Sequence, residues 1–239
     1  INVVSMPIDA SFDSSGGLLE WTPARPQIGE FLLSATDAGG QTGFLSLVIG
    51  AKGQLFRGVV GQALLDSLRV HFYPQSFLDY GSAVDSVLAV VSPNASGEIK
   101  GIYSDFNLQL EAGDPSTVAA QAGMVVEHIW PESQGSGLTP QRSDLHNLYP
   151  ALETVQLARE EKPFGEIADT DTEHWYWLDT ATTSTPNSDI AEYSESTGTS
   201  WEPREDRKGD VARAMFYFSL TYASDVDEQF FLRQLGELQ

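Results

Sequence analysis

The sequence predicts an α+β protein in which a short all-β N-terminal segment precedes a longer, mainly helical part. Up to about residue 50, apolar residues alternate with small or polar ones, as they do in strands with one buried face. Beyond residue 55, apolar residues recur at helical spacing, interrupted by short strand-like runs. Hydrophobic residues make up 41% of the 239 residues, which is ample for a buried core, so we expect a globular protein.

The N-terminal segment has the pattern of a β-hairpin. Residues 31–35 and 44–48 alternate, and Asp37-Ala-Gly-Gly40 supplies the turn between them. The surrounding pattern resembles the C-terminal half of the bacterial immunoglobulin-like or cadherin-like modules that repeat in large surface proteins. The residues that carry this similarity are Gly17, Trp21, Thr22, Pro23, Gln27, Gly29, Phe31, Ala35, Thr36 and Asp37. We therefore predict a partial immunoglobulin-like segment over residues 1–51; the alternative is a hairpin that packs on a single domain.

The rest of the chain mixes helices and short strands. Four stretches have apolar residues at helical spacing, and the last has Asp210 near its start, where an acidic side chain favours a helix. These stretches are residues 58–72, 82–91, 151–159 and 210–222. Short strands are expected within residues 97–106 and over residues 124–129. The section over residues 169–207, rich in Thr, Ser, Glu and Asp, is expected to be loop.

The charge balance is strongly acidic, with 13 Lys and Arg against 34 Asp and Glu and a net charge of −21. Affinity for nucleic acid usually depends on many Lys and Arg contacts to phosphate, so phosphate chemistry here has to be local or assisted by a metal cation. Such acidity maintains solubility at high salt, which favours a saline or extracellular setting. The beginning of the chain at Ile1 is typical of a mature protein or an excised fragment.

Two absences from the sequence narrow the chemistry. The chain contains no cysteine, which excludes disulfides, thiolate zinc sites and cysteine nucleophiles and leaves histidine and carboxylate for metal or proton chemistry. No run approaches 18 consecutive apolar residues, so we expect no membrane insertion.

The residues that could carry chemistry gather between residues 125 and 160. Glu127 and His128 end an apolar run in "VVEHIWPES", and His146 lies in a second short apolar stretch, "DLHNLYP". Alone, a Glu-His pair at a strand end is a weak signal, and we expect His71 and His174 in packing or surface roles. A strand, a loop, a second strand and a helix of this length can, however, bring an imidazole and a polar helix side chain together around one cation such as Mg²⁺.

The order and spacing of these motifs resemble the endonuclease I family. The similar stretches are "VEHIWPES", "SDLHNLYP", "ETVQLAR", "KPFGEI", "WEPREDRKGDVARAMFYF" and, upstream, "IYSDF" and "LDYGSAVDSVL". The family consists of bacterial periplasmic or secreted nonspecific nucleases built on a ββα-metal core, also called a His-Me finger. The similarity predicts a nuclease domain over residues 55–239 that lacks the family's C-terminal end, because the chain stops at "FFLRQLGELQ".

The resemblance to this family implies roles for His128, Glu127 and Gln156 in catalysis and metal binding. His128 would be the general base that takes a proton from the attacking water. Glu127 would bind a divalent cation, normally Mg²⁺ with Mn²⁺ or Ca²⁺ as alternatives, that stabilises the phosphorane and the leaving group. The family's helix usually reads "VNxxRSN", with its first Asn as the second metal ligand, whereas this chain has Gln156 there. We expect the Gln156 amide oxygen to bind the metal; the alternatives are help from Glu160 or a weakened site.

Four basic residues are candidates for phosphate contacts: Arg142, Arg159, Lys208 and Arg213. Arg159 matches the helix arginine of the family and could equally orient the core through buried hydrogen bonds. For Lys208 and Arg213, ion pairs at the start of a helix are an equally strong alternative.

Three further polar residues, Asp144, His146 and Asn147, are expected to support the site. They suit partners that fix the turn and the orientation of His128, because metal sites usually need such support. We do not predict His146 as a base. A zinc hydrolase is disfavoured, because His128 and His146 are 18 residues apart and the chain contains no HExxH motif.

The predicted function is a metal-dependent, sequence-nonspecific endonuclease that hydrolyses DNA, with RNA as a further substrate. We expect it to be secreted, periplasmic or attached to the bacterial cell surface, as part of a larger multidomain polypeptide. The alternative is a catalytically weakened or inactive nuclease-fold module of a large secreted or surface protein. The acidic composition and the altered helix ligands favour this alternative.

Overall fold

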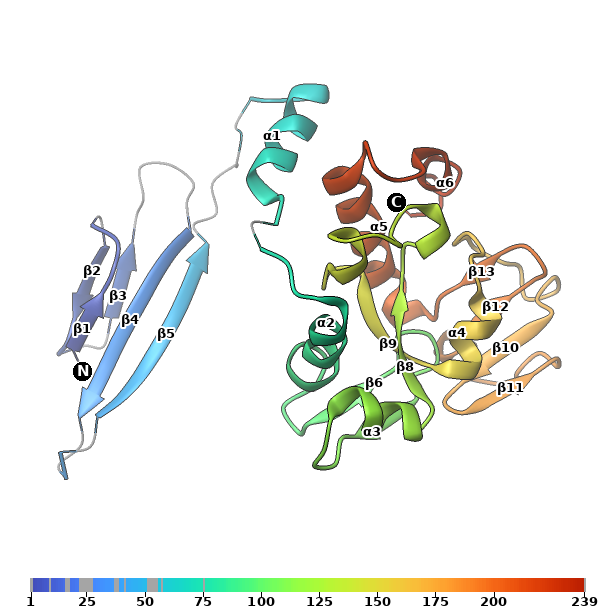
Figure 1. Cartoon of the computed structure of the whole chain (residues 1–239), viewed down its shortest axis with the longest axis horizontal. Helices are drawn as coiled ribbons and strands as arrows, with labels where there is room; N and C mark the ends of the chain where they lie inside the picture. Colours follow the sequence, from blue (N-terminus) through green and yellow to red (C-terminus); the bar gives the residue numbers. More distant parts are fainter. Residues whose placement is uncertain are drawn as a thin grey trace. The chain divides into compact units, whose positions relative to one another are not determined.

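The computed structural model describes residues 2–8, 10–15, 18–21, 28–36, 39–40, 42–50, 56, 58–74 and 76–238, with backbone only for residues 44–50. The chain divides into two compact units, Ile1–Ser67 and Leu68–Gln239, which are described separately below. Figure 1 shows both units and labels most of their helices and strands. The domain limits expected from the sequence, 1–51 and 55–239, remain a prediction.

The first unit consists of antiparallel strands. These are β1 (Asn2–Ser5), β2 (Ala10–Asp13), β3 (Leu18–Trp21), β4 (Ile28–Thr36) and β5 (Thr42–Gly50). The strand order is β1-β4-β5 in one sheet and β2-β3 in the other. Phe31 is buried, and the ring of Trp21 packs edge-on against it with centroids 5.5 Å apart. The predicted hairpin is thus confirmed as β4–β5, although Asp37 and Ala38 of its turn lie outside the described residues. The immunoglobulin-like assignment stays a prediction.

The second unit mixes helices and strands, as expected for an α+β protein. Its helices, together with one that spans the boundary between the units, are α1 (Gln62–Phe72), α2 (Tyr80–Ser86) with a π-helical turn (Val87–Val91), α3 (Pro115–Gln121), α4 (Glu153–Arg159), α5 (Lys208–Tyr222) and α6 (Glu228–Leu232). Its strands are β6 (Glu98–Lys100), β7 (Asn107–Gln109), β8 (Met124–His128), β9 (Leu148–Leu152), β10 (His174–Trp177), β11 (Thr180–Thr182), β12 (Ser194–Ser196) and β13 (Trp201–Glu202). They form the antiparallel pairs β6–β7 and β8–β9 and one four-stranded sheet, β11-β10-β12-β13.

The helices expected from apolar spacing are all present, with shifted ends. The helix expected over residues 151–159 begins at Glu153, because residues 151 and 152 complete β9 opposite β8. One expectation is wrong: the section over residues 169–207, expected to be loop, contains the sheet β10–β13. Its strands are two to four residues long, too short for an alternating pattern, and polar residues such as Ser194 and Glu195 are buried in them.

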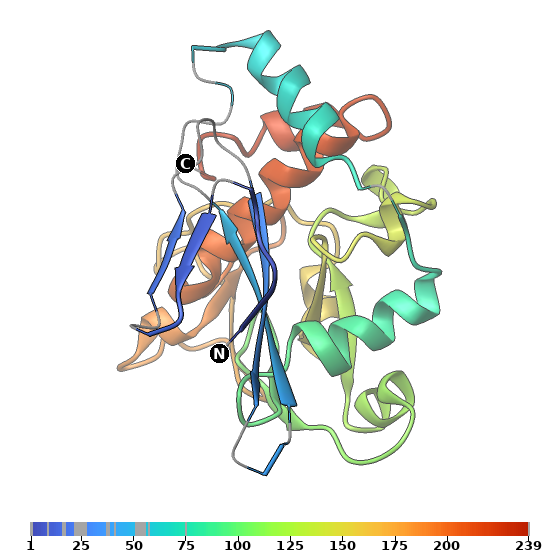
Figure 2. The same ribbon diagram turned by 90° about the vertical axis from the view of Figure 1, so that its left-hand side faces the viewer.

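The β8–β9 hairpin lies between two apolar clusters. On one face, Met124, Val126 and Leu148 pack with residues of α2 and α3. On the other, Ile129 and Ala151 pack with residues of α4, α5 and α6. Figures 1 and 2 show the hairpin with α2 and α3 to one side of it and α5 to the other. Burial on both faces fixes the hairpin firmly, and with it the residues at the end of β8.

Candidate active site

A cleft of about 760 Å³ lies at the end of β8, and its lining includes Tyr80 of α2 and three residues of α4. Successive side chains of a strand point to opposite faces. Glu127 therefore faces α4, where it contacts Arg159, and His128 faces α2, where it stacks with Tyr80. Both border the cleft, as does Gln156 on α4. The alternation of a single strand thus gives two neighbouring residues different surroundings.

Glu127 is a buried carboxylate with several donors around it. The Oη of Tyr103 and the Nη1 of Arg159 each donate a hydrogen bond of 3.1 Å to its Oε1 atom, and the Gln156 side chain lies beside the carboxylate and lowers its pKa. Burial raises the pKa of Glu127, and Arg159, Tyr103 and Gln156 oppose that rise. A positive charge bound in the cleft would favour the ionised form further.

The imidazole of His128 is held in one orientation by the backbone. Its Nε2 atom lies 3.0 Å from the carbonyl oxygen of Arg142. Because a carbonyl can only accept, Nε2 carries the hydrogen, and the lone pair of the neutral ring is on Nδ1. Burial lowers the pKa of His128; the carbonyl hydrogen bond and the charge of Glu132 raise it, and the charge of Arg142 lowers it. The net lowering favours the neutral imidazole at neutral pH.

Three side chains that the sequence did not connect surround this imidazole. Tyr80 of α2 stacks with His128, with ring centroids 5.7 Å apart and planes at 20°. The guanidinium of Arg142 lies 4.1 Å from the Tyr80 centroid, and its Nε donates to Glu132 at 2.8 Å. The same Glu132 oxygen lies 3.8 Å from His128 Nδ1. Of these, Glu132 stands four residues after His128 and could have been suspected; Tyr80 is distant in sequence and gives no such signal.

Arg159 is fully buried and binds the end of β8 to α4. Its Nη1 donates to Glu127 and, at 3.4 Å, to the carbonyl of His128; its Nη2 donates to the carbonyl of Ile129 at 2.8 Å. The guanidinium also lies 4.6 Å from the Phe164 ring centroid. Of the two roles that the sequence left open for Arg159, these contacts correspond to orienting the core through buried hydrogen bonds.

Asn147 fixes the chain directly after His128. Its Oδ1 accepts from the backbone N–H of Trp130 at 2.6 Å, its Nδ2 donates to the Trp130 carbonyl at 3.1 Å, and its own carbonyl accepts from the Ile129 N–H. Asn147 is fully buried, so these bonds are shielded from water. The supporting role expected for Asn147 in the site stays a prediction.

Asp144 and His146 lie instead against α5. The Asp144 carboxylate accepts from His146 Nδ1 at 3.0 Å and from the hydroxyls of Tyr217 and Tyr222 at 2.9 and 2.7 Å. Burial raises the pKa of Asp144, but these hydrogen bonds outweigh it and leave the pKa lowered, and the same contact raises that of His146. Within the described part of the chain, no hydrogen bond, ion pair or ring contact joins either residue to His128.

Lys208 and Arg213 have carboxylate partners. The Nζ of Lys208 lies 2.7 Å from Glu166 and Glu202 and 2.6 Å from Glu205, while Arg213 pairs with Asp210. These contacts correspond to the ion-pair alternative. Among the described residues, Glu166, Glu202 and Glu205 are a group of three acids close enough to share one cation, and the ammonium of Lys208 contacts all three.

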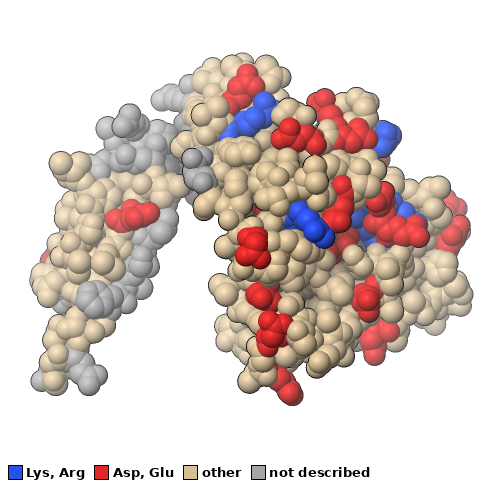
Figure 3. Space-filling model, viewed as in Figure 1, with Lys and Arg blue, Asp and Glu red and all other residues tan. Residues whose placement is uncertain are grey.

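The cleft has little free positive charge for a phosphate. Arg142 and Arg159 are paired with Glu132 and Glu127, and Lys162 donates to the Ala158 carbonyl. Two further carboxylates, those of Glu160 and Glu161 directly after α4, also border the cleft. On the face shown in Figure 3, Asp and Glu predominate over Lys and Arg. The paired charges of the cleft agree with the expectation from the net charge that phosphate chemistry here has to be local or assisted by a metal cation.

The residues at the cleft fit a hard divalent cation. Mg²⁺ takes one or two protein oxygens and fills its remaining positions with water and phosphate oxygens. Glu127 offers a carboxylate oxygen, and the Gln156 amide beside it can present its oxygen by rotating its terminal torsion. Neither thiolate nor a group of imidazoles lines this cleft, so oxygen donors dominate the described site.

Comparison with known proteins relates this chain to one family and to two extracellular ribonucleases. The model of the Endonuclease I family matches residues 52–234. An extracellular ribonuclease of Bacillus subtilis (strain 168) is 35% identical over 106 residues, which cover 41% of this chain and 29% of that protein. An extracellular ribonuclease of Bacillus amyloliquefaciens is 34% identical over 98 residues, covering 40% and 28%. The chain thus spans less than a third of the length of these two relatives.

Within the described residues, no helix combines the length and the apolar character that crossing a bilayer requires.

Proposed function

Because the chain belongs to the endonuclease I family, we propose that its cleft hydrolyses phosphodiester bonds of nucleic acid with the help of a divalent cation. The observation that carries the proposal is that Glu127 and His128 of β8 border the same cleft as Gln156 of α4, the helix that follows the hairpin partner β9. We take this hairpin and helix to be a ββα-metal core.

His128 is the general base of the proposed reaction. Its Nε2–H is held by the Arg142 carbonyl, so Nδ1 is the atom that accepts the proton of the attacking water. The imidazolium that forms has the carboxylate of Glu132 3.8 Å from Nδ1, which stabilises its charge. The lowered pKa keeps the ring unprotonated before the reaction.

Glu127 and Gln156 would hold the cation through oxygen atoms. A bound Mg²⁺, or Mn²⁺ or Ca²⁺ in its place, would neutralise the charge that builds on the phosphorane and on the leaving oxygen. Arg159 favours the ionised form of Glu127 and holds its Oε1 atom through a hydrogen bond. Arg142, at the cleft surface, contacts the phosphate once it exchanges Glu132 for the substrate.

The proposed substrate is DNA, with RNA as a further one. Phosphate contacts position a nucleic acid without reading its sequence, and the proposed roles of Arg142 and the cation are both of this kind. The two similar Bacillus proteins are named extracellular ribonucleases, which supports RNA cleavage and secretion. We further propose that the chain acts as part of a longer secreted or surface polypeptide that includes the β1–β5 segment.

Cleavage assays with matched histidine variants test this proposal. The protein should degrade plasmid DNA with Mg²⁺ and stop when EDTA is added. His128→Ala should lose roughly 10²–10⁴-fold activity, the share that general-base catalysis typically supplies. His174→Ala, which removes an exposed imidazole on β10, is the control and should cleave like the wild type. Cleavage by His128→Ala at the wild-type rate would remove this residue from the mechanism.

A second candidate is an inactive or weakened nuclease fold that binds partners. It is favoured by Gln156, which is one methylene longer than the family's asparagine, and by Glu160 and Glu161 in place of "SN". Calorimetric titration with Mg²⁺ or Mn²⁺ separates the two. Cation-dependent heat that disappears in Glu127→Ala supports the enzyme, and its absence from the wild type together with no cleavage supports the inactive module.

A further inference from the structure

Tyr103 reaches Glu127 from outside the hairpin and helix. It lies in the turn that follows β6, its side chain is fully buried, and its Oη donates to Glu127 Oε1 at 3.1 Å. Arg159 Nη1 donates to the same oxygen at the same distance. A carboxylate oxygen has about two lone-pair directions, so these two donors occupy Oε1 and leave Oε2 as the oxygen for a further ligand.

We propose that Tyr103 is a positioning residue that fixes which oxygen of Glu127 is offered to the cation, and that the sheet β10–β13 holds Tyr103 in place. The inference rests on the proposed role of Glu127 as a metal ligand. Without the phenol, the carboxylate would keep only the Arg159 donor on Oε1 and could rotate, so that the oxygen facing the cleft would no longer be fixed.

The backbone of Tyr103 is tied to β12. Its carbonyl oxygen accepts from the hydroxyl of Ser194 at 2.6 Å, and that hydroxyl in turn accepts from the backbone N–H of Arg204 at 3.0 Å. Ser194 is fully buried, so this chain of bonds is shielded from water. The neighbouring residue, Ser104, accepts from the N–H of Leu178 after β10. The turn thus has two backbone connections to the sheet.

The ring of Tyr103 is held by aromatic side chains from the same region. It packs edge-on against Trp201 of β13, with centroids 5.2 Å apart and planes at 63°. Trp201 also stacks with Tyr176 of β10, at 5.0 Å and 30°. The phenol therefore approaches Glu127 from a packed aromatic wall, which limits its rotation.

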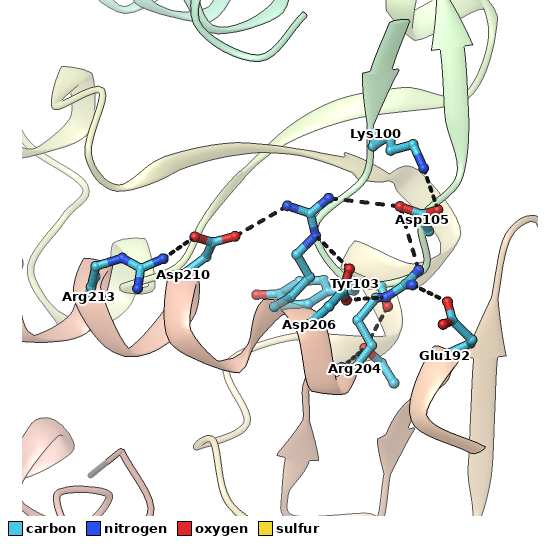
Figure 4. A network of polar contacts seen from close by, with 10 residues as sticks. Lys100, Tyr103, Asp105, Glu192, Arg204, Asp206, Asp210 and Arg213 are labelled. Carbon is cyan, nitrogen blue, oxygen red and sulfur yellow. Dashed lines mark hydrogen bonds and ion pairs between the residues drawn. The ribbon is translucent and has the colours of Figure 1, made fainter. Parts of the chain in front are cut away.

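Ion pairs brace the turn on its far side. Asp105 has a left-handed backbone, with φ of 55°, which a non-glycine residue adopts at some cost. Its carboxylate lies 2.8 Å from Lys100, 3.6 Å from Arg204 and 3.9 Å from Arg207. Figure 4 shows these pairs with Tyr103 beside them. Partly buried Asp105 and buried Arg204 thus link the turn to the segment that follows β13.

Mn²⁺ binding without nucleic acid tests the proposal, with the wild type, Glu127→Ala and Tyr103→Phe titrated by calorimetry. Glu127→Ala identifies the heat that belongs to the cleft, since an acidic surface also binds Mn²⁺ elsewhere. Tyr103→Phe keeps the ring and removes only the donor. We expect its dissociation constant for the cleft site to rise roughly 10-fold or more, as outer partners of metal ligands typically cause. Cleavage by Tyr103→Phe should recover partly at high Mn²⁺.

The control is Tyr222→Phe, which removes a phenol donor from the buried carboxylate Asp144 away from the cleft. It should bind Mn²⁺ like the wild type. Ser194→Ala, which leaves the phenol intact but frees the Tyr103 carbonyl, should weaken binding in the same direction by a smaller factor. If circular dichroism shows that Tyr103→Phe does not fold, the Mn²⁺ titration of Ser194→Ala tests the proposal in its place.

The outcomes separate the two proposals. A wild type without cleft binding of Mn²⁺ overturns the proposed function and this inference with it. Wild-type binding that Tyr103→Phe leaves unchanged overturns this inference alone, as does an equal loss in Tyr222→Phe. If Tyr103→Phe does not fold, unchanged Mn²⁺ binding by Ser194→Ala overturns this inference alone.

Discussion

Two buried carboxylates of the second unit, Glu127 in the cleft and Glu202 on β13, each contact a cationic side chain, but their surroundings differ. Glu202, Glu166 and Glu205 each contact the ammonium of Lys208 at 2.7 Å or less. Glu127 contacts Arg159 at 3.1 Å through one of its two oxygens and borders an open cleft. Both Glu127 and Glu202 are buried, and burial raises the pKa of each.

The two places differ in whether the cationic side chain leaves a carboxylate oxygen free for another ligand. An ammonium has three donors, and in the Lys208 cluster each goes to a different carboxylate, so the cluster already contains its cation. At Glu127 the planar guanidinium also binds backbone carbonyls, and it donates to Oε1 alone. A group of acids can therefore bind an exchangeable cation only where its own basic residue leaves an oxygen free and space beside it.

Neutralising the buried carboxylate at each of the two places should give the largest difference between them in Mn²⁺ binding and cleavage. Glu127→Gln removes the proposed anionic ligand, and we expect cleft binding of Mn²⁺ to weaken roughly 100-fold or more, with a matching loss of DNA cleavage. Glu202→Gln, measured by the same titration and cleavage assay, should change neither. Equal losses in both variants would mean that the two carboxylates contribute to metal binding in the same way.

The central part of the site could be predicted because it is contiguous. Glu127 and His128 end one strand, and Gln156 follows within a single hairpin and helix, so a motif in the sequence places all three near each other. The helices were equally accessible, since their apolar residues recur over several turns.

The remaining contacts could not be predicted, because they join segments that no local pattern connects. Tyr80 and Tyr103 come from α2 and from the turn after β6 and reach His128 and Glu127 only in the folded chain. In the sheet that supports Tyr103, the buried residues of β12 are Ser194, Glu195 and Ser196, so the strand reads as polar loop. Burial of polar groups with satisfied hydrogen bonds leaves little trace in hydrophobic periodicity.

Removing the ammonium of the Lys208 cluster should lower the stability of the protein and leave the cleft active. In Lys208→Met the buried Glu202 and its two more exposed neighbours lose their shared partner. We expect the free energy of unfolding to fall by roughly 2 kcal/mol, less than the ~3–5 kcal/mol typical of fully buried pairs, because Glu166 and Glu205 are exposed. Urea denaturation measures the change. Arg213→Met, at an exposed pair, should stay within about 0.5 kcal/mol of the wild type.

Glu195 on β12 sharpens the comparison, because its hydrogen-bonded partner is a hydroxyl, that of Thr172, and not a cation. Burial raises its pKa to about 7. Between about pH 4.5 and 7 the folded state then keeps a proton that the unfolded state releases, so stability falls as pH rises through this window. Glu195→Gln should remove up to about 3 kcal/mol of this decline between pH 4.5 and 8, as measured by urea denaturation.

The control for this pH dependence is Glu173→Gln, which neutralises an exposed carboxyl of the same region. It should leave the decline as in the wild type. A decline of unchanged size in Glu195→Gln would mean that another group carries it.

The smallest effect is expected at the cleft surface, where Glu132 pairs with Arg142. This exposed pair is worth about 0.2–1 kcal/mol, and a phosphate has to replace Glu132 before it can bind Arg142. Glu132→Gln should therefore lower KM for DNA up to roughly 5-fold at low salt, with less effect at high salt, because screening already weakens the pair. Glu161→Gln removes a cleft carboxylate that, within the described part of the chain, makes no ion pair with Arg142, and it should change KM less. An equal decrease of KM in both variants would indicate general repulsion of the substrate by the cleft carboxylates. A decrease specific to Glu132→Gln would identify Arg142 as the phosphate contact with which Glu132 competes.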